Sequence, residues 1–462
     1  MSPETASPGR GAPRFVGRWP GPTGHWLTGC VRLIQNDPLN FYRRAWATYG
    51  DYVEIRILPR AYFYFLCDPS AVEHVLSKDH KNYRKPDVLN KPVRMLTGNG
   101  MFVNEGESWL RQRRLSQPAF LRKHIASFSP QIVAAVEQLA EEWEREQEGR
   151  RLDVVPEMMR LSLRIASTAM FSTDISADAD VIGHAFRSAF DYVRRRMNGR
   201  ITFPLAVPTT QNREFRRCKA LLDRVVLELI ESRRREPTGQ DVLALLLAAQ
   251  DEESGTRMTD QQLKDEVITF PTAGHETTAA ALSWAWYLLA QHPDDQKALH
   301  DEALARLHGR TPTADDLPHL PFATAVFEET MRLYPPAWGL PRETIDDDEI
   351  NGYPLRKKTI VTLSQWVTHR HPQYWSEPDS FQPERFLPGQ TDVRPEFAYF
   401  PFGGGPRACI GNHFAMLKGP LVLAALAQRF QFTLVPEHAV IPDATFTLRP
   451  KTGVKVVLRK RR

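Results

Sequence analysis

Cysteine is scarce in this 462-residue chain, and the four that occur, Cys30, Cys67, Cys218 and Cys409, form no C-x-x-C pair. This spacing excludes a disulfide-stapled secreted scaffold and predicts a reducing, cytoplasmic location. The chain also lacks the long apolar runs of a signal peptide or a membrane anchor, so no membrane anchor is expected. A net charge of +5 is small for this length, which argues against nucleic acid as a partner.

The periodicity of apolar residues predicts a mainly α-helical protein with small β-sheets, an α+β fold. Prolines crowd the start of the chain and predict an extended leader over residues 1–30. Amphipathic helices dominate from about residue 107 to residue 309, whereas strand-like runs lie near both ends. No repeat or internal linker interrupts the remainder, so residues 31–462 are expected to form a single domain.

The strongest local signal is the segment F-G-G-G-P-R-A-C-I-G, which runs from Phe402 to Gly411 into a helical stretch. A cysteine at a helix start is expected to have a lowered pKa, because backbone N–H groups favour the thiolate of Cys409. Glycines such as Gly403 let the backbone approach a flat cofactor, and Arg407 can pair with a carboxylate of that ligand. The alternative is a buried structural cysteine after a tight turn.

The pattern F-x-x-G-x-R-x-C-x-G resembles the haem-binding loop of cytochrome P450s. The resemblance implies haem b with the Cys409 thiolate as the iron ligand, in surroundings that include Phe402, Gly403, Arg407 and Gly411. It implies a soluble, bacterial-type haem domain over residues 31–462. Too few residues follow Cys409 for a fused flavin reductase, so the electron donor is expected to be a separate protein.

A second segment, A-G-H-E-T-T from Ala273 to Thr278, lies in a helical stretch over residues 260–291. The Thr277 hydroxyl can bond the carbonyl of Ala273, four residues earlier, and open the helix there. The segment is similar to the oxygen-activating helix of the family, which implies room for dioxygen at Gly274 and an acid and alcohol pair in Glu276 and Thr277. The alternative is a packing seam of small residues.

Three further motifs occur along the chain in the same order as in cytochrome P450s. Glu329 and Arg332 form E-x-x-R, and the resemblance implies a buried bridge with Arg385 of the P-E-R-F segment. Trp109 and Arg113 match W-x-x-x-R, whose indole N–H and guanidinium are suitable donors to a haem propionate. Arg342 resembles another propionate contact.

Two residues depart from the family pattern. Pro271 is unusual inside the oxygen helix, where it has no N–H and is expected to add strain. Lys418 stands where many relatives have glutamate, and we expect it on the surface near the cysteine. A basic docking face for an acidic ferredoxin or flavodoxin, itself served by a reductase, is predicted from the following residues: Arg111, Arg113, Arg114, Arg122, Lys123 and Lys418.

The resemblance implies a monooxygenase that inserts one atom of O2 into a hydrophobic small molecule such as a fatty acid, terpenoid or steroid. Residues 83–102, 197–208 and 337–340 are the expected pocket walls, and apolar side chains such as Val88 and Leu96 are available there. Two alternatives remain, a peroxide-driven peroxygenase and a non-catalytic haem-binding sensor or carrier. The presence of Glu276 and Thr277 argues against a peroxygenase.

Overall fold

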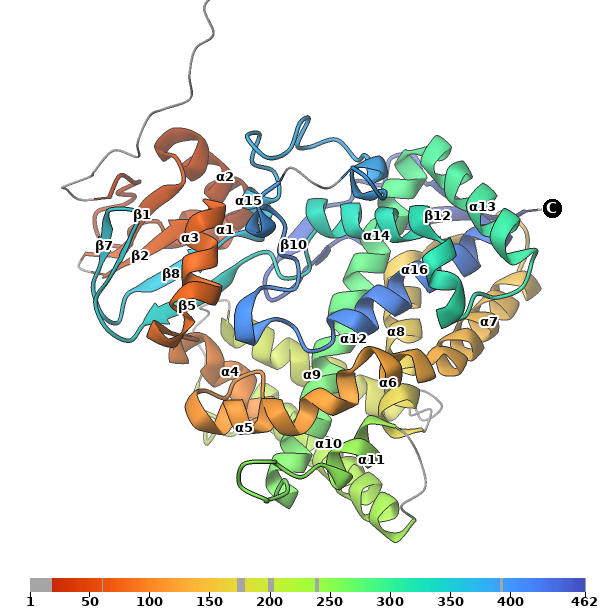
Figure 1. The fold of residues 1–462 in the computed structure, drawn as a ribbon, viewed down its shortest axis with the longest axis horizontal. Coiled ribbons are helices and arrows are strands. Elements are labelled where there is room, and N and C mark those ends of the chain that lie inside the picture. The colour runs from red at the N-terminus through yellow and green to blue at the C-terminus, as the bar shows by residue number, and fades with distance from the viewer. Residues whose placement is uncertain are drawn as a thin grey trace, which may run out of the picture.

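The fold is described from a computed structural model of the chain (Figure 1). The structure describes residues 19–59, 61–172, 179–197, 203–236, 241–390 and 394–461. Residues 1–18 of the predicted leader lie outside the described ranges. From Trp19 onward the chain is packed: the Trp19 ring contacts the rings of Tyr64 and Tyr353, and the Pro20 carbonyl accepts the N–H of Glu54 at 2.8 Å.

Helices form most of the molecule, as predicted. The α-helices are α1 (Val31–Asn36), α2 (Pro38–Tyr49), α3 (Pro69–Glu73), α4 (Asp87–Thr97), α5 (Gly106–Ser116), α6 (Arg122–Ser127), α7 (Ser129–Arg145), α8 (Val154–Phe171), α9 (Ala179–Met197), α10 (Thr210–Arg235), α11 (Val242–Ala248), α12 (Asp260–Gln291), α13 (Pro293–Leu307), α14 (Pro321–Leu333), α15 (Gln365–Thr368) and α16 (Asn412–Arg429). Short 3₁₀ turns include η5 (Pro383–Phe386) and η7 (Gly405–Arg407).

In the part of the chain that the structure describes, four small sheets complete the fold. Their strands are β1 (Tyr52–Leu58), β2 (Ala61–Leu66), β3 (Tyr83–Arg84), β4 (Arg151–Asp153), β5 (Leu340–Thr344), β6 (Asp348–Ile350), β7 (Tyr353–Leu355), β8 (Ile360–Leu363), β9 (Phe430–Leu434), β10 (Pro442–Ala444), β11 (Leu448–Pro450) and β12 (Lys455–Lys460). The largest sheet has the order β1-β2-β8-β5-β3, with β2 and β8 parallel and the other pairs antiparallel. The other sheets are β4-β12-β9, β10-β11 and β6-β7.

Local capping explains where several helices begin. The Asp37 side chain accepts the N–H of Asn40 at the start of α2, with proline at the first helical position. A capping box of Thr259 and Gln262 starts α12, because each side chain accepts the backbone N–H of the other residue. Each of these contacts joins residues three positions apart, so it depends only on the local sequence.

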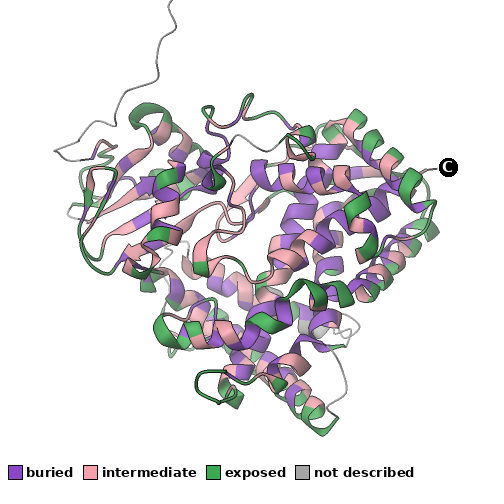
Figure 2. Cartoon of the chain, viewed as in Figure 1, coloured by how far each residue is buried: buried purple, intermediate pink, exposed green. Residues whose placement is uncertain are grey.

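The five-stranded sheet and α1 to α3 lie at one side of the molecule, and the helical part occupies the other (Figure 1). Helix α12 runs through the middle of the helical part, where it packs on α8, α14 and α16. Figure 2 shows these central helices largely buried. Their apolar side chains form the largest core cluster, and two smaller clusters lie against the five-stranded sheet. No helix among the described residues is long and apolar enough to cross a bilayer.

Candidate functional site

A tight glycine loop delivers Cys409 to the start of α16. The Cys409 N–H donates to the carbonyl oxygen of Phe402 at 2.9 Å and so closes the loop. Gly403 and Gly405 adopt φ angles of +70° and +61°. A Cβ atom on Gly405 would lie 1.9 Å from the carbonyl oxygen of Leu76, so the loop requires glycine at that position.

The Cys409 thiol is exposed, whereas the other three cysteines are buried. Desolvation raises its pKa above the ordinary value and outweighs the Gly411 backbone N–H, Arg113 and Lys85, which lower it. The prediction of a lowered pKa is therefore wrong. Desolvation of the thiolate raises the pKa by more than the backbone N–H groups at the start of the helix lower it. A sulfur that is accessible yet surrounded by protein lies in a recess, where a flat group can reach it.

Four cationic side chains gather around the same recess: Lys85, Arg113, Arg342 and Arg407. Burial, Arg342 and Arg407 lower the pKa of Lys85 to about 7, while burial and Arg407 lower that of Arg342 to about 10. The carboxylate of Glu105 acts in the opposite direction on both groups. One carboxylate cannot neutralise four cations, so the cluster suits a ligand with further negative charge.

The donors of this cluster fit the carboxylates of a haem. Within the described ranges, neither the indole N–H of Trp109 nor the guanidinium of Arg113 has a hydrogen-bond partner. Among the described residues, the Arg342 guanidinium donates only to the carbonyl oxygen of Pro341, at 2.9 Å. Arg407 forms an ion pair with Glu105 and lies 4.0 Å from the centre of the Trp109 ring, so part of its charge is already matched within the protein.

On α12, the predicted side-chain bond is present. The Thr277 Oγ1 donates to the Ala273 carbonyl oxygen at 2.8 Å. A Cβ atom on Gly274 would meet no atom within 4 Å outside its own stretch of helix, which leaves open space at this turn. Helix α12 continues through Pro271, which is buried within it.

Glu276 and Thr277 do not bond to each other. The Glu276 Oε1 instead accepts a hydrogen bond from the Thr447 hydroxyl at 2.6 Å, and both residues are buried. Consecutive residues lie about 100° apart around a helix, so the two side chains leave α12 in different directions. Burial raises the pKa of Glu276 to about 7, although the bond from Thr447 lowers it.

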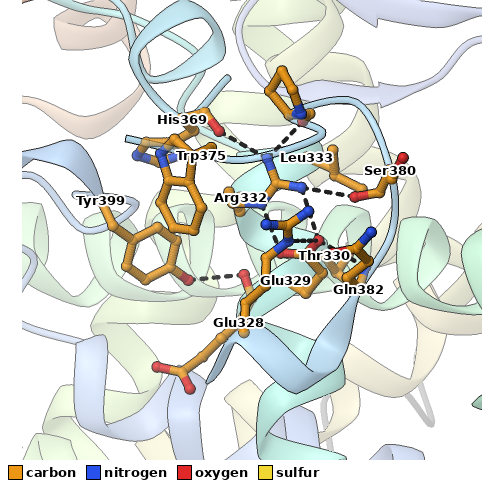
Figure 3. A network of polar contacts seen from close by, with 12 residues as sticks. Glu328, Glu329, Thr330, Arg332, Leu333, His369, Trp375, Ser380, Gln382 and Tyr399 are labelled. Carbon is orange, nitrogen blue, oxygen red and sulfur yellow. Dashed lines mark hydrogen bonds and ion pairs between the residues drawn. The ribbon is translucent and has the colours of Figure 1, made fainter. Parts of the chain in front are cut away.

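Figure 3 shows the buried pair formed by Glu329 and Arg332 on α14. The Arg332 Nε and Nη2 donate to the two Glu329 carboxylate oxygens at 2.6 and 2.8 Å, and neither side chain is exposed. Arg385 of η5 lies 3.6 Å from Glu329, which completes the bridge that the resemblance implies. The remaining Arg332 hydrogens go to the carbonyls of His369, Pro378 and Ser380. Arg332 therefore ties α14 to the chain that leads to the Cys409 loop.

The predicted basic docking face is smaller than expected. Arg111 and Arg114 donate to the loop over residues 251–257, which includes two acidic partners of Arg114. Arg122 and Lys123 are exposed on α6, which packs on α16. The exposed cations of this face are therefore concentrated on α6.

The predicted surface position of Lys418 is wrong. Its side chain has no exposed area, and its amine donates to the carbonyl oxygen of Gly274 on α12. The physical reason is that α16 is packed between α7, α13 and α14, so this part of the helix has no solvent side.

An aromatic cluster joins segments that lie far apart in the sequence. The Phe446 ring lies 6.1 Å from that of Phe102 and 5.2 Å from that of Phe190, and it is next to Thr447. Of the predicted pocket walls, residues 198–202 lie outside the described residues, and Val88 is 65% exposed. Phe102 lies in the predicted wall 83–102, whereas Phe190 and Phe446 lie outside all three predicted walls.

Sequence reasoning missed Lys85, Glu105 and Thr447. Lys85 and Glu105 lie in loops without a repeating pattern, and Thr447 is 171 residues from the carboxylate it binds. A charge count near Trp109 could have suggested Glu105, but no local signal identifies Thr447.

Comparison with known proteins agrees with this geometry. The Cytochrome P450 family model matches residues 19–457. Cyclooctatin synthase of Streptomyces melanosporofaciens is 36% identical over 430 residues, which cover 92% of each chain. Cyclooctat-9-en-7-ol 5-monooxygenase of the same species is 35% identical and covers 89% of this chain and 88% of the relative. Pentalenene oxygenase of Streptomyces avermitilis is 32% identical, with 91% and 93% covered.

Solved structures show the same fold. The crystal structure of the cytochrome P450DA heme domain matches with a TM-score of 0.88 at 28% identity, and the match covers 96% of this chain and 98% of that one.

Proposed function

This chain belongs to the cytochrome P450 family, and we propose that it is a haem-thiolate monooxygenase that inserts one oxygen atom of O2 into a hydrophobic cyclic terpenoid. The observation that carries this function is the exposed Cys409 thiol at the start of α16, in a recess bordered by excess positive charge. No other cysteine of the described chain is exposed.

The proposed cofactor is haem b, with Cys409 as the iron ligand. Trp109, Arg113 and Arg342 have the donors to hold its propionates, while Arg407 keeps Glu105 as its partner. Phe402, Gly403 and Gly411 shape the loop around the sulfur. When bound, a thiolate-ligated haem supplies the electron push that favours cleavage of the O–O bond.

The chain's own contribution to the chemistry is assigned to α12. Gly274 leaves space beside the Ala273 carbonyl, and the Thr277 hydroxyl, now bonded to that carbonyl, can turn to donate its proton into the space. Glu276 holds a proton on its carboxyl group up to about pH 7, so it is a proton source near neutral pH. Thr447 orients that carboxyl group through Oε1.

The proposed substrate class rests on two lines of support. Relatives that match most of the chain are named for pentalenene and cyclooctat-9-en-7-ol. Phe102, Phe190 and Phe446 form an aromatic cluster beside Thr447, the residue that bonds Glu276, and such apolar rings suit a cyclic hydrocarbon skeleton.

We further propose that an acidic ferredoxin or flavodoxin supplies electrons by docking on α6. Reversing the charge of exposed Lys123 with Lys123→Glu should slow reduction at low salt, and the difference should shrink as salt rises. Lys451→Glu, at an exposed lysine after β11, is the matched control. Equal reduction rates for both variants would contradict docking at α6.

The experiment that tests the function is a turnover assay in ¹⁸O2 with a ferredoxin, its reductase and a panel of cyclic terpenoids, fatty acids and steroids. A monooxygenase incorporates one labelled atom in the product. Product that forms only with hydrogen peroxide would favour a peroxygenase. Haem binding without product from any member of the panel would favour the sensor or carrier alternative.

A further inference from the structure

A lysine lies in the middle of α16 with no exposed area. Lys418 is on the same helix that begins after Cys409, and its Nζ donates to the Ser162 Oγ at 3.0 Å and to the Gly274 carbonyl oxygen at 3.2 Å. The amine also lies 5.2 Å from the centre of the Phe414 ring. The amine thus has two hydrogen-bond acceptors and one aromatic ring as neighbours.

The contact with Gly274 is part of a larger arrangement on α12. Three consecutive carbonyls, those of residues 273–275, each accept a side-chain hydrogen bond. The donors come from three different helices: Thr277 of α12 itself at 2.8 Å, Lys418 of α16 at 3.2 Å and Ser162 of α8 at 2.9 Å. A second donor on a helical carbonyl competes with the N–H four residues later and tilts the carbonyl outward.

Burial of the Lys418 amine at this position destabilises the folded protein. Burial lowers the pKa of the amine to about 7, and no charged group acts on it in the described chain. A buried amine without a counter-ion opposes folding, whereas methionine has a similar length and carries no such cost. Stability therefore does not explain why lysine occupies this site, but its hydrogen bond to α12 does.

We infer that Lys418 is a positioning residue of the active site: from the helix that follows the Cys409 loop, it holds the Gly274 carbonyl and sets the shape of the α12 turn that contains Ala273 and Thr277. The role couples the cysteine side of the haem site to the oxygen side through one side chain. Its effect on turnover rests on the proposed function, whereas its effect on the spectrum requires only bound haem.

The test uses the holoenzyme with Lys418→Met and a matched control, Gln428→Met. Gln428 is another buried polar residue of α16, but it bonds the loop at residues 309–310 and not α12. We expect Lys418→Met to shift the ferric spin equilibrium, read from the optical spectrum, by about fivefold, the effect of one lost hydrogen bond. Its thermal stability should equal or exceed that of the wild type, while Gln428→Met should be less stable with an unchanged spectrum.

Ser162→Ala provides a second variant, because it removes a bond to Lys418 and the bond to the carbonyl at position 275. Its spectral shift should not add to that of Lys418→Met in the double variant, since both act on one turn. An unchanged spectrum in Lys418→Met, or a loss of stability like that of Gln428→Met, would overturn the inference. If the wild type binds haem but forms no product, the proposed function fails while the spectral comparison still decides the role of Lys418.

Discussion

The Glu276 carboxylate accepts a hydrogen bond from the Thr447 hydroxyl at 2.6 Å, across 171 residues of sequence. This contact joins the middle of α12 to the loop between β10 and β11. It also turns the acid away from its neighbour Thr277, which bonds the Ala273 carbonyl. Acid and alcohol therefore have separate anchors, and their contributions can be separated by mutation.

The raised pKa of Glu276 predicts that the free energy of unfolding depends on pH. Its folded pKa of about 7 lies above its ordinary 4.5, so between these values the folded protein holds a proton that the unfolded chain has released. The free energy of unfolding should therefore fall as pH rises from about 4.5 through about 7. Glu276→Gln should make this slope shallower without abolishing it, because burial also raises the pKa of Glu266 to about 8 and that of Glu328 to about 7. Urea unfolding of both proteins between about pH 5 and pH 8 measures it.

Turnover should respond to the same group. If protonated Glu276 supplies a proton, the rate should fall above about pH 7. Thr447→Val should move this midpoint upward, because the hydroxyl lowers the pKa of the acid. A pH profile that is the same for the wild type and Glu276→Gln would contradict a proton-supplying role.

Thr277→Ala removes the hydroxyl that bonds the Ala273 carbonyl. Product formed per electron pair should drop by about tenfold or more, while consumption of the electron donor continues, because proton delivery is impaired. Thr277→Ser keeps the hydroxyl and is the control. The measurement is product against oxidised electron donor in the same reaction, and equal ratios for the two variants would refute the assignment.

Arg342→Leu should weaken retention of the haem. Among the described residues, the buried guanidinium donates only to its neighbour's backbone carbonyl, and a charged hydrogen bond to a carboxylate contributes about 1.5–3 kcal/mol. Transfer of haem to an excess of an acceptor apoprotein should accelerate by about tenfold or more. Arg122→Leu, at an exposed position on α6, should transfer haem at the wild-type rate. Unchanged transfer from Arg342→Leu would exclude a propionate contact.

The Glu329 and Arg332 pair should matter for folding and not for chemistry. Arg332→Ala leaves a fully buried carboxylate and should cost about 3–5 kcal/mol of unfolding free energy. Arg332→Lys, which keeps the charge but loses the paired geometry, covers the case in which the alanine variant does not fold. Arg145→Ala breaks an exposed pair with Glu141 and should cost about 0.5 kcal/mol or less. If Arg332→Lys and Arg145→Ala lost similar amounts of unfolding free energy, the buried pair would contribute no more to stability than an exposed pair does.

Local chemistry explains what sequence reasoning predicted correctly. The bond from Thr277 to Ala273 joins residues four positions apart, and helix geometry alone brings them together. The pairing of Glu329 with Arg332 is local in the same way. Their burial was expected only from the family resemblance, because the same spacing also occurs in exposed pairs.

By itself, then, the sequence determined the helical class, the loop that presents Cys409 and the contacts made within single turns. Only the tertiary structure decided that Lys418 is buried against Gly274, that Thr447 holds Glu276 and that cations outnumber carboxylates around the recess. Those contacts join residues more than a hundred positions apart, or surround one group from several elements. These contacts depend on how the helices pack and on which face of each helix is buried. The spacing of neighbouring residues predicts neither the packing nor the buried face.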